Sequence, residues 1–255
     1  MPRPTELCRI QDIAFPLEYL GGMRFTNLAH LIACTLLSCL AFAGPAVLES
    51  KKARADVTLT ANPDSPFWRD LPGVIVTTDY AGTPVPNNRM EVRSRWTSDN
   101  LYILFICEFD ELTLKPNPTT NEETNKLWDW DVAEAFVGSD LNDIARYKEF
   151  EVSPQGEWVD LDIDRGPLKR GAGVAWNSGF EVKAQIDRKR KIWYGEMKIP
   201  FETLGVRSPA SGTRLRAGIF RCAGREPSRK LISWQTTGAR SFHVPERFGT
   251  LALNE

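Results

Sequence analysis

The sequence predicts an all-β protein folded as an antiparallel β-sandwich, and three observations carry that prediction. About nine short strand-like runs, rich in β-branched and aromatic residues, follow one another along the chain. Polar turn signals separate these runs at regular spacing, and no long amphipathic helical pattern interrupts them. The 255 residues are enough for one such domain with a full core.

The N-terminal segment reads as a targeting sequence. Residues 1–22 form an upstream extension, and residues 23–43 form a signal peptide whose apolar run ends in Ala41-Phe42-Ala43, a signal-peptidase pattern. That run is too short for a membrane span. A lipoprotein box at Cys39 is a second reading, ranked lower because the apolar run continues past the cysteine. We therefore expect a periplasmic or extracellular protein that starts at Gly44, with no membrane contact after cleavage.

The exported chain then divides into a short leader, residues 44–55, and one domain, residues 56–255. In that domain Met90–Trp96 alternates strictly, with Glu91, Arg93 and Arg95 on one face, which is typical of a strand with one wet face. Leu101–Phe109 is almost continuously apolar, which predicts a strand buried in mid-sheet.

The stretch Leu127–Gly138 concentrates aromatic and acidic residues before an apolar run. In a strand, Val132, Glu134 and Phe136 share one face, and the alanines and valine between them share the other. An indole offers a flat apolar face, and a carboxylate accepts hydrogen bonds from neighbouring hydroxyls. This composition suits a polyol site, although a core tryptophan with a solvated acidic edge fits equally well.

The remaining strands follow at regular intervals to the end of the chain. A hairpin crosses Pro154-Gln155-Gly156, and a second crosses a basic turn. The predicted strands of this part are Tyr147–Ser153, Glu157–Ile163, Phe180–Ile186, Lys191–Ile199, Arg214–Cys222, Leu231–Trp234 and Phe248–Leu253.

Composition narrows the functional classes. Lys and Arg number 32 and Asp and Glu number 33, so the net charge of −1 argues against a nucleic-acid partner. All eight tryptophans lie after residue 67, which favours aromatic stacking surfaces as well as core packing. Cys107 and Cys222 remain after signal cleavage; they are either buried free thiols or a disulfide between strands. The absence of a Cys/His cluster in the sequence gives a zinc site no support.

Four motifs, in this order along the chain, resemble the family 9 carbohydrate-binding modules. They are Arg95-Trp96-Thr97-Ser98-Asp99-Asn100-Leu101-Tyr102, Trp128-x-x-Asp131-x-x-Glu134-x-Phe136, the run Trp193–Phe201, and His243-Val244-Pro245-Glu246-Arg247-Phe248-Gly249. The resemblance implies an immunoglobulin-like sandwich that binds oligo- or polysaccharides in secreted polysaccharide-degrading systems, often beside glycoside hydrolases. It also implies bound calcium and a sugar ring held between two tryptophans.

Matching the motifs position by position gives the expected sugar-binding residues. Trp128 corresponds to the first tryptophan and Glu134 to the binding carboxylate. The second tryptophan lies six residues before the closing Phe-Gly, where this chain has Phe242. The resemblance therefore implies a clamp, formed by Trp128 and Phe242, with Glu134 between the two rings.

Two polar positions depart from the family pattern. An arginine that contacts sugar corresponds to about Glu151, and an asparagine to about Ala239, so neither is kept. These changes put the specificity of the site in question, but not the fold. We expect accessory contacts from Asp131, Trp130 and His243, which adjoin the matched positions.

A calcium site is a separate expectation. Asp160, Asp162 and Asp164 alternate along one predicted strand, so their carboxylates share a face and could ligate calcium through oxygen. A solvated strand face explains the same pattern.

Three alternatives to sugar binding stay open. A glycosidase using Asp131 and Glu134 is disfavoured, because acids three residues apart on a strand lie on opposite faces and cannot flank one bond. A haem-binding sandwich would need His243 with Met90 or Met197 as axial ligands. An adhesive or structural module is the third. The sequence favours a non-catalytic binding domain over all three.

Overall fold

The computed structural model describes residues 46–166 and 174–255, which form an all-β domain with two single 3₁₀ turns. Its strands are β1 Val47–Lys52, β2 Val74–Val76, β3 Met90–Trp96, β4 Asn100–Glu108, β5 Val132–Gly138, β6 Arg146–Val152, β7 Trp158–Asp164, β8 Val174–Ala175, β9 Glu181–Asp187, β10 Ile192–Pro200, β11 Arg214–Ala223, β12 Lys230–Ser233 and β13 Gly249–Asn254. The 3₁₀ turns are η1 Leu127–Asp129 and η2 Pro245–Arg247. The prediction of an all-β, mostly antiparallel fold is confirmed.

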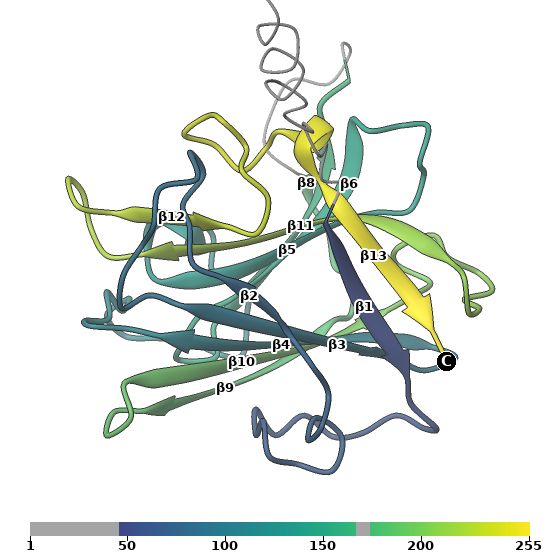
Figure 1. Ribbon diagram of the computed structural model, residues 1–255, viewed down its shortest axis with the longest axis horizontal. Helices are drawn as coiled ribbons and strands as arrows, with labels where there is room; N and C mark the ends of the chain where they lie inside the picture. Colours follow the sequence, from purple (N-terminus) through teal and green to yellow (C-terminus); the bar gives the residue numbers. More distant parts are fainter. Residues whose placement is uncertain (1–45, 167–173) are drawn as a thin grey trace, which may run out of the picture. The chain divides into compact units, whose positions relative to one another are not determined.

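The strands form two layers that belong to one hydrogen-bonded path (Figure 1). Its order is β8-β7-β6-β5-β11-β13-β1-β3-β4-β10-β9, with β12 beside β11 and β2 beside β3. Among the described strands, only β1 pairs in parallel, on one side with β13 and on the other with β3. The pair β1 and β13 thus connects the two layers. The immunoglobulin-like topology implied by the resemblance stays a prediction.

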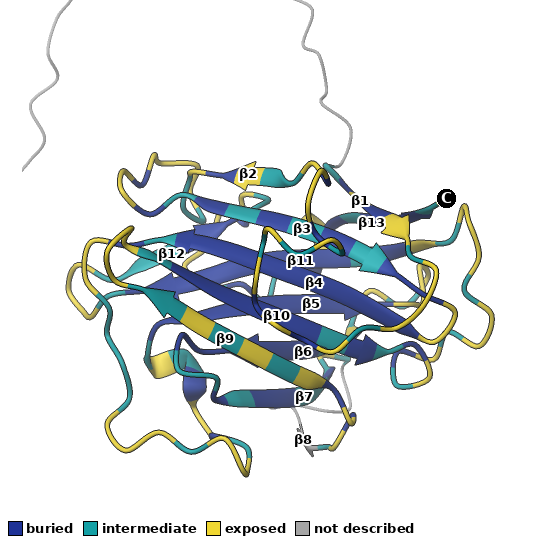
Figure 2. Ribbon diagram, turned by 90° about the horizontal axis from the view of Figure 1, so that it is seen from below, coloured by how far each residue is buried: buried dark blue, intermediate teal, exposed yellow. Residues whose placement is uncertain are grey.

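The main core lies between the layers, where apolar side chains from both meet. Ala133, Ala135 and Val137 of β5 enter this core, whereas Val132 and Phe136 join a second apolar cluster on the outer face of the same layer. The alternation predicted for β5 is therefore confirmed. Figure 2 shows the central strands buried along their length and β9 alternating between exposed and half-buried residues.

The outer face of the opposite layer is covered by the irregular segment that precedes β2. Trp68 of this segment is fully buried against Tyr102 and neighbouring strand residues. The Glu196 carboxylate on β10 accepts hydrogen bonds from the backbone N–H groups of Thr60 at 2.7 Å and Ala61 at 2.6 Å, and from the Trp68 indole at 2.6 Å. One buried carboxylate therefore fastens the segment to the sheet.

The interpretation of residues 44–55 as a leader is wrong for half of that range. Residues 47–52 form β1, which lies inside the sheet rather than before the domain. Leu48 is buried in the main core, and the Ser50 hydroxyl accepts a hydrogen bond of 2.8 Å from Ser94. The sequence VLESKK has one short apolar pair and three charges, so it gives little strand signal. Its pairing with distant strands determines its conformation.

Replacing Leu48 by alanine is expected to lower the free energy of unfolding by about 2–4 kcal/mol, because the change leaves a cavity where β1 packs on the core. Lys51→Ala, in the same strand but exposed, should change it by less than about 0.5 kcal/mol. Chemical denaturation of both variants measures the difference. Equal stability of the two variants would show that β1 is dispensable.

The two described cysteines are free thiols, so the disulfide alternative is wrong. Cys107 on β4 belongs to the main core, whereas Cys222 on β11 belongs to the outer apolar cluster. The β11 backbone separates the two side chains. Burial raises the pKa of the Cys107 thiol to about 12, which keeps it protonated and unreactive.

The predicted extension, signal peptide and cleavage site before Gly44 lie outside the described residues, as does the lipoprotein cysteine, Cys39. Cleavage before Gly44 would leave β1 intact. Within the part of the chain that the structure describes, no helix has the length and hydropathy needed to cross a membrane.

Candidate functional site

A cavity of about 490 Å³ lies against the outer face of the layer that contains β5, β6, β7 and β11. Glu134 of β5 and Glu149 of β6 line it together with apolar residues of β7 and β12. Its remaining walls come from η1 and from the loops on either side of β12. Trp128 of η1 therefore meets Phe242 and His243 of the loop after β12 in one cavity, although they are far apart in sequence.

Trp128 lies in η1, directly before β5, and is half-buried. Lys126 begins this turn in the left-handed conformation, with φ of 58°. The Arg229 guanidinium holds the turn from the other side by donating to the carbonyl of Trp128 and to those of Asp129 at 2.9 Å and Trp130 at 3.2 Å. The turn therefore presents the indole to the cavity from a fixed backbone.

Phe242 lines the same cavity but is only 7% exposed. Its ring stacks on Phe220 of β11, with centroids 4.4 Å apart and an interplanar angle of 9°. The structure thus brings the two predicted clamp residues to one cavity. Trp128 is the accessible ring, while Phe242 is mostly part of the wall.

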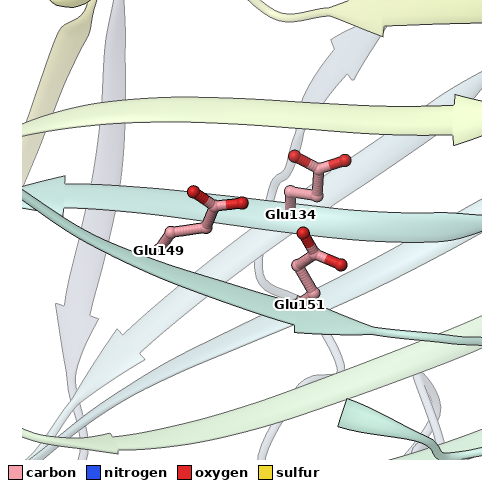
Figure 3. A group of neighbouring side chains, drawn as sticks. All are labelled: Glu134, Glu149 and Glu151. Carbon is pink, nitrogen blue, oxygen red and sulfur yellow. The ribbon is translucent and has the colours of Figure 1, made fainter. Parts of the chain in front are cut away.

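Glu134 does not stand alone in the cavity floor. Glu151 lies directly opposite it in the pairing of β5 with β6, and Glu149 lies opposite Phe136. These three glutamates, here called the acid cluster, are all buried, and one oxygen from each lies within 4.8 Å of the others (Figure 3). They could hold a cation, and they are the sole convergent group of potential metal ligands among the described residues.

Burial and mutual repulsion raise the pKa values of the acid cluster. Burial, followed by the charge of Glu149, raises the pKa of Glu134 to about 8. Burial raises the pKa of Glu149 to about 7, and burial together with its two acidic neighbours holds the pKa of Glu151 well above its ordinary value. Three carboxylates in an apolar setting therefore keep protons at neutral pH unless a cation replaces them.

Raising the pH from 6.5 to 8 in a chelating buffer is expected to lower the melting temperature. Unfolded glutamates, with pKa near 4.5, have lost their protons by pH 6.5, whereas the folded acid cluster still holds some. The free energy of unfolding therefore falls as the pH passes through the raised pKa values of the folded acid cluster. Buried His243 has its pKa lowered to about 4 and acts with the opposite sign, but only below pH 6.5.

Glu149→Gln removes one of these titrations and should flatten the stability profile measured by thermal unfolding. A melting temperature that stays level or rises between pH 6.5 and 8 in the unaltered protein would contradict the prediction.

His243 is a wall residue of the cavity. Its Nδ1 lies 2.7 Å from the Tyr147 hydroxyl, and its ring stacks on Phe136 at 5.1 Å. The haem hypothesis fails here, because Met90 and Met197 lie in the main core, on the other side of the β5–β6 layer from His243. The histidine and a methionine cannot face each other across one haem.

The other two accessory residues are placed outside the cavity. Asp131 is fully buried, and its carboxylate accepts a hydrogen bond of 2.7 Å from the backbone of Gly224, which ties the start of β5 to the end of β11. Trp130 is half-buried, with the Arg225 guanidinium 5.9 Å from its ring centre. Asp131 therefore supports the turn, and it does not lie across the cavity from Glu134 as a glycosidase pair would.

The three aspartates of β7 have other partners. Asp160 accepts a hydrogen bond of 2.7 Å from the backbone of Ser178, and Asp162 forms an ion pair of 2.7 Å with Lys148. Asp164 pairs with Arg146 at 3.3 Å. These contacts direct the carboxylates to separate partners, so they do not converge on a common ion position.

Sequence reasoning missed several residues of the site. Glu149 was detectable, because the β6 alternation places it on the same face as Glu151. Cys222 was considered as a buried free thiol or a disulfide partner and not as a residue of the site, yet its Sγ lies 3.3 Å from Glu134 Oε1. Arg229 gave no signal, since a loop residue that grips backbone carbonyls follows no periodic pattern. Ala239, the position of the missing asparagine, is exposed and outside the cavity lining.

Comparison with known protein families shows to which family this chain belongs. The sequence profile described as "Carbohydrate family 9 binding domain-like" matches residues 66–255. The chain belongs to this family. An extracellular protein of Arthroderma benhamiae is similar to it, with 24% identity over 176 residues that cover 64% of this chain and 78% of the fungal one.

Solved structures share this fold at low sequence identity. A Bacteroides uniformis protein described as carbohydrate-binding matches with a TM-score of 0.63 and 15% identity, covering 83% of this chain and 100% of that one. A family 9 module of Caldicellulosiruptor kristjanssonii in complex with cellotriose matches with a TM-score of 0.58 and 14% identity, covering 82% of this chain and 94% of that one. A family 9 module of the same organism in complex with glucose matches with a TM-score of 0.57 and 15% identity, covering 81% of this chain and 95% of that one.

Proposed function

We propose that the protein is an exported, non-catalytic carbohydrate-binding domain whose cavity holds a sugar ring against Trp128. The observation that carries the proposal is the meeting of a half-buried indole, the Phe242 ring and the Glu134 carboxylate in one cavity of a family 9 chain. The cavity volume of about 490 Å³ falls within the range of roughly 300–1,000 Å³ typical of small-ligand sites.

The chemistry of the cavity suits a polyhydroxylated ring. The Trp128 indole can cover the apolar C–H face of a sugar, while Glu134 and Glu149 accept hydrogen bonds from its hydroxyl groups. Arg225 and Glu226 line the cavity as further polar groups. Since related modules were solved with cellotriose and glucose, β-linked gluco-oligosaccharides are the first ligands to examine.

Export and a place beside glycoside hydrolases complete the proposal. The signal-peptide pattern before Gly44 and the similar extracellular fungal protein support export. We propose that this domain holds polysaccharide chains for glycoside hydrolases.

Isothermal titration of the purified protein with glucose, cellotriose and xylo-oligosaccharides tests this function. We expect saturable binding of at least one of them, without release of reducing sugar during prolonged incubation. Failure to bind any neutral oligosaccharide on a glycan array would overturn the proposal, and hydrolysis of a ligand would replace it with an enzymatic function.

A further inference from the structure

We propose that Glu134, Glu149 and Glu151 form a binding site for a hard divalent cation, of which calcium is the best match, at the floor of the cavity. The site differs in position from the predicted aspartate site on β7, and among the described residues no lysine or arginine forms an ion pair with its carboxylates. It shares Glu134 and Glu149 with the proposed sugar site, but cation binding there does not depend on sugar binding.

The spacing of the acid cluster matches the size of such an ion. One oxygen from each glutamate lies within 4.8 Å of the other two. Oxygen ligands of calcium lie roughly 2.3–2.6 Å from the ion, so ligand oxygens around one ion are separated by at most about twice that distance. The β5–β6 pairing sets the arrangement, because Glu134 and Glu151 face each other directly and Glu149 is on the same side of β6.

Buried oxygens of the acid cluster lack hydrogen-bond partners outside the cluster. Glu151 is fully buried, and among the described residues neither its carboxylate oxygens nor Glu149 Oε2 accepts a hydrogen bond from another group; within the cluster, a hydrogen bond between Glu149 and Glu151 contributes to their pKa values. Figure 3 shows the carboxylates of all three residues turned toward a common space. Buried polar atoms in folded proteins are almost always paired, so this group of unpaired oxygens indicates a missing ligand.

No neighbouring protein cation fills that role among the described residues. Arg229 directs its guanidinium to carbonyls of the η1 turn and of Gly224. His243 Nε2 lies 3.9 Å from Glu149 Oε2, beyond hydrogen-bond distance, and its Nδ1 is paired with the Tyr147 hydroxyl. The Cys222 thiol reaches only Glu134. The Arg229 charge lowers the pKa values of Glu134 and Glu151, but its guanidinium donates to backbone carbonyls rather than to these carboxylates, so up to three negative charges are only partly compensated.

The ligand set selects the class of ion. Carboxylate oxygens suit calcium, magnesium and manganese, whereas zinc and copper prefer nitrogen and sulfur. Calcium tolerates irregular arrangements and six to eight ligands, which fits three carboxylates supplemented by water. Glu134 and Glu149 line the cavity, so an ion can enter from it and its free coordination positions face it.

A calcium titration of the chelator-treated protein, followed by thermal unfolding, tests the site. We expect calcium to raise the melting temperature in a saturable manner, because an ion that binds only the folded state stabilises it. Terbium, a luminescent calcium substitute, should bind competitively and be sensitised by tryptophan. Glu151→Gln, which removes a buried charge without changing shape, should weaken terbium and calcium binding at least tenfold while the protein remains folded by circular dichroism.

Two further variants keep the result interpretable. Glu149→Gln should reproduce the loss, whereas Asp162→Asn, on the aspartate face of β7, should bind calcium as the unaltered protein does. Absence of any calcium effect, or an effect that survives both glutamine variants, would overturn the proposal. Loss in Asp162→Asn alone would also overturn it and place the ion on β7. All arms are run without sugar, so their outcome is separate from that of the carbohydrate titration.

Discussion

Replacing Trp128 by alanine is expected to weaken sugar binding about ten- to a hundredfold while the domain stays folded. The indole is half-buried in η1, and it is the accessible aromatic ring of the cavity. Stacking of a flat ring on an aromatic side chain contributes on the order of 1–3 kcal/mol, by analogy with base stacking, which corresponds to this loss of affinity. Titration calorimetry with the best oligosaccharide measures it.

Trp176→Ala is the matched control for this variant. Trp176 is also half-buried, but it packs on the main core and does not line the cavity. Sugar affinity should survive this change. If Trp128→Ala binds sugar with unaltered affinity, or if it fails to fold, Trp128 is a structural residue and the sugar lies elsewhere.

Replacing Glu196 by alanine is expected to lower the free energy of unfolding by about 3–5 kcal/mol. The change removes the acceptor of two backbone N–H groups and of the Trp68 indole N–H. All three donors belong to the irregular segment before β2 and point toward the sheet. Each buried donor left without a partner costs roughly 1–3 kcal/mol, and partial entry of water reduces the sum. Denaturant unfolding measures the loss.

The free energy of unfolding of Glu196→Gln should lie between those of the alanine variant and the unaltered protein, since the amide keeps one acceptor oxygen. The control is Glu181→Ala on neighbouring β9, where an exposed ion pair with Lys198 should contribute less than about 1 kcal/mol. Similar losses in Glu196→Ala and Glu181→Ala would mean that the segment is held by apolar packing alone.

Most strands were predictable because their side chains alternate or are continuously apolar. The predicted Met90–Trp96 coincides with β3, and Leu101–Phe109 is shifted by one residue from β4. The strands missed were β1, which is rich in charge and pairs with distant β13 and β3, and β2 and β8, which are only three and two residues long. Local pattern carries no information on such pairing.

The site was predictable only in part, and for a similar reason. The resemblance supplied Trp128, Glu134 and Phe242, and the structure brings these three to one cavity. The resemblance could not indicate that Phe242 would stack on Phe220, because that contact depends on how a loop returns to the sheet. The acid cluster emerges only when the register of β5 against β6 is known.

The pairing of β1 with β13 has a consequence for how the chain reaches its folded state. Leu48 pairs with Leu251, so strands from the two ends of the domain must meet before the layers are joined. Such distant contacts make folding slow, because a long loop has to close before any contact stabilises it. Since β13 follows all the other described strands in the sequence, the sandwich cannot close until β13 has been synthesised.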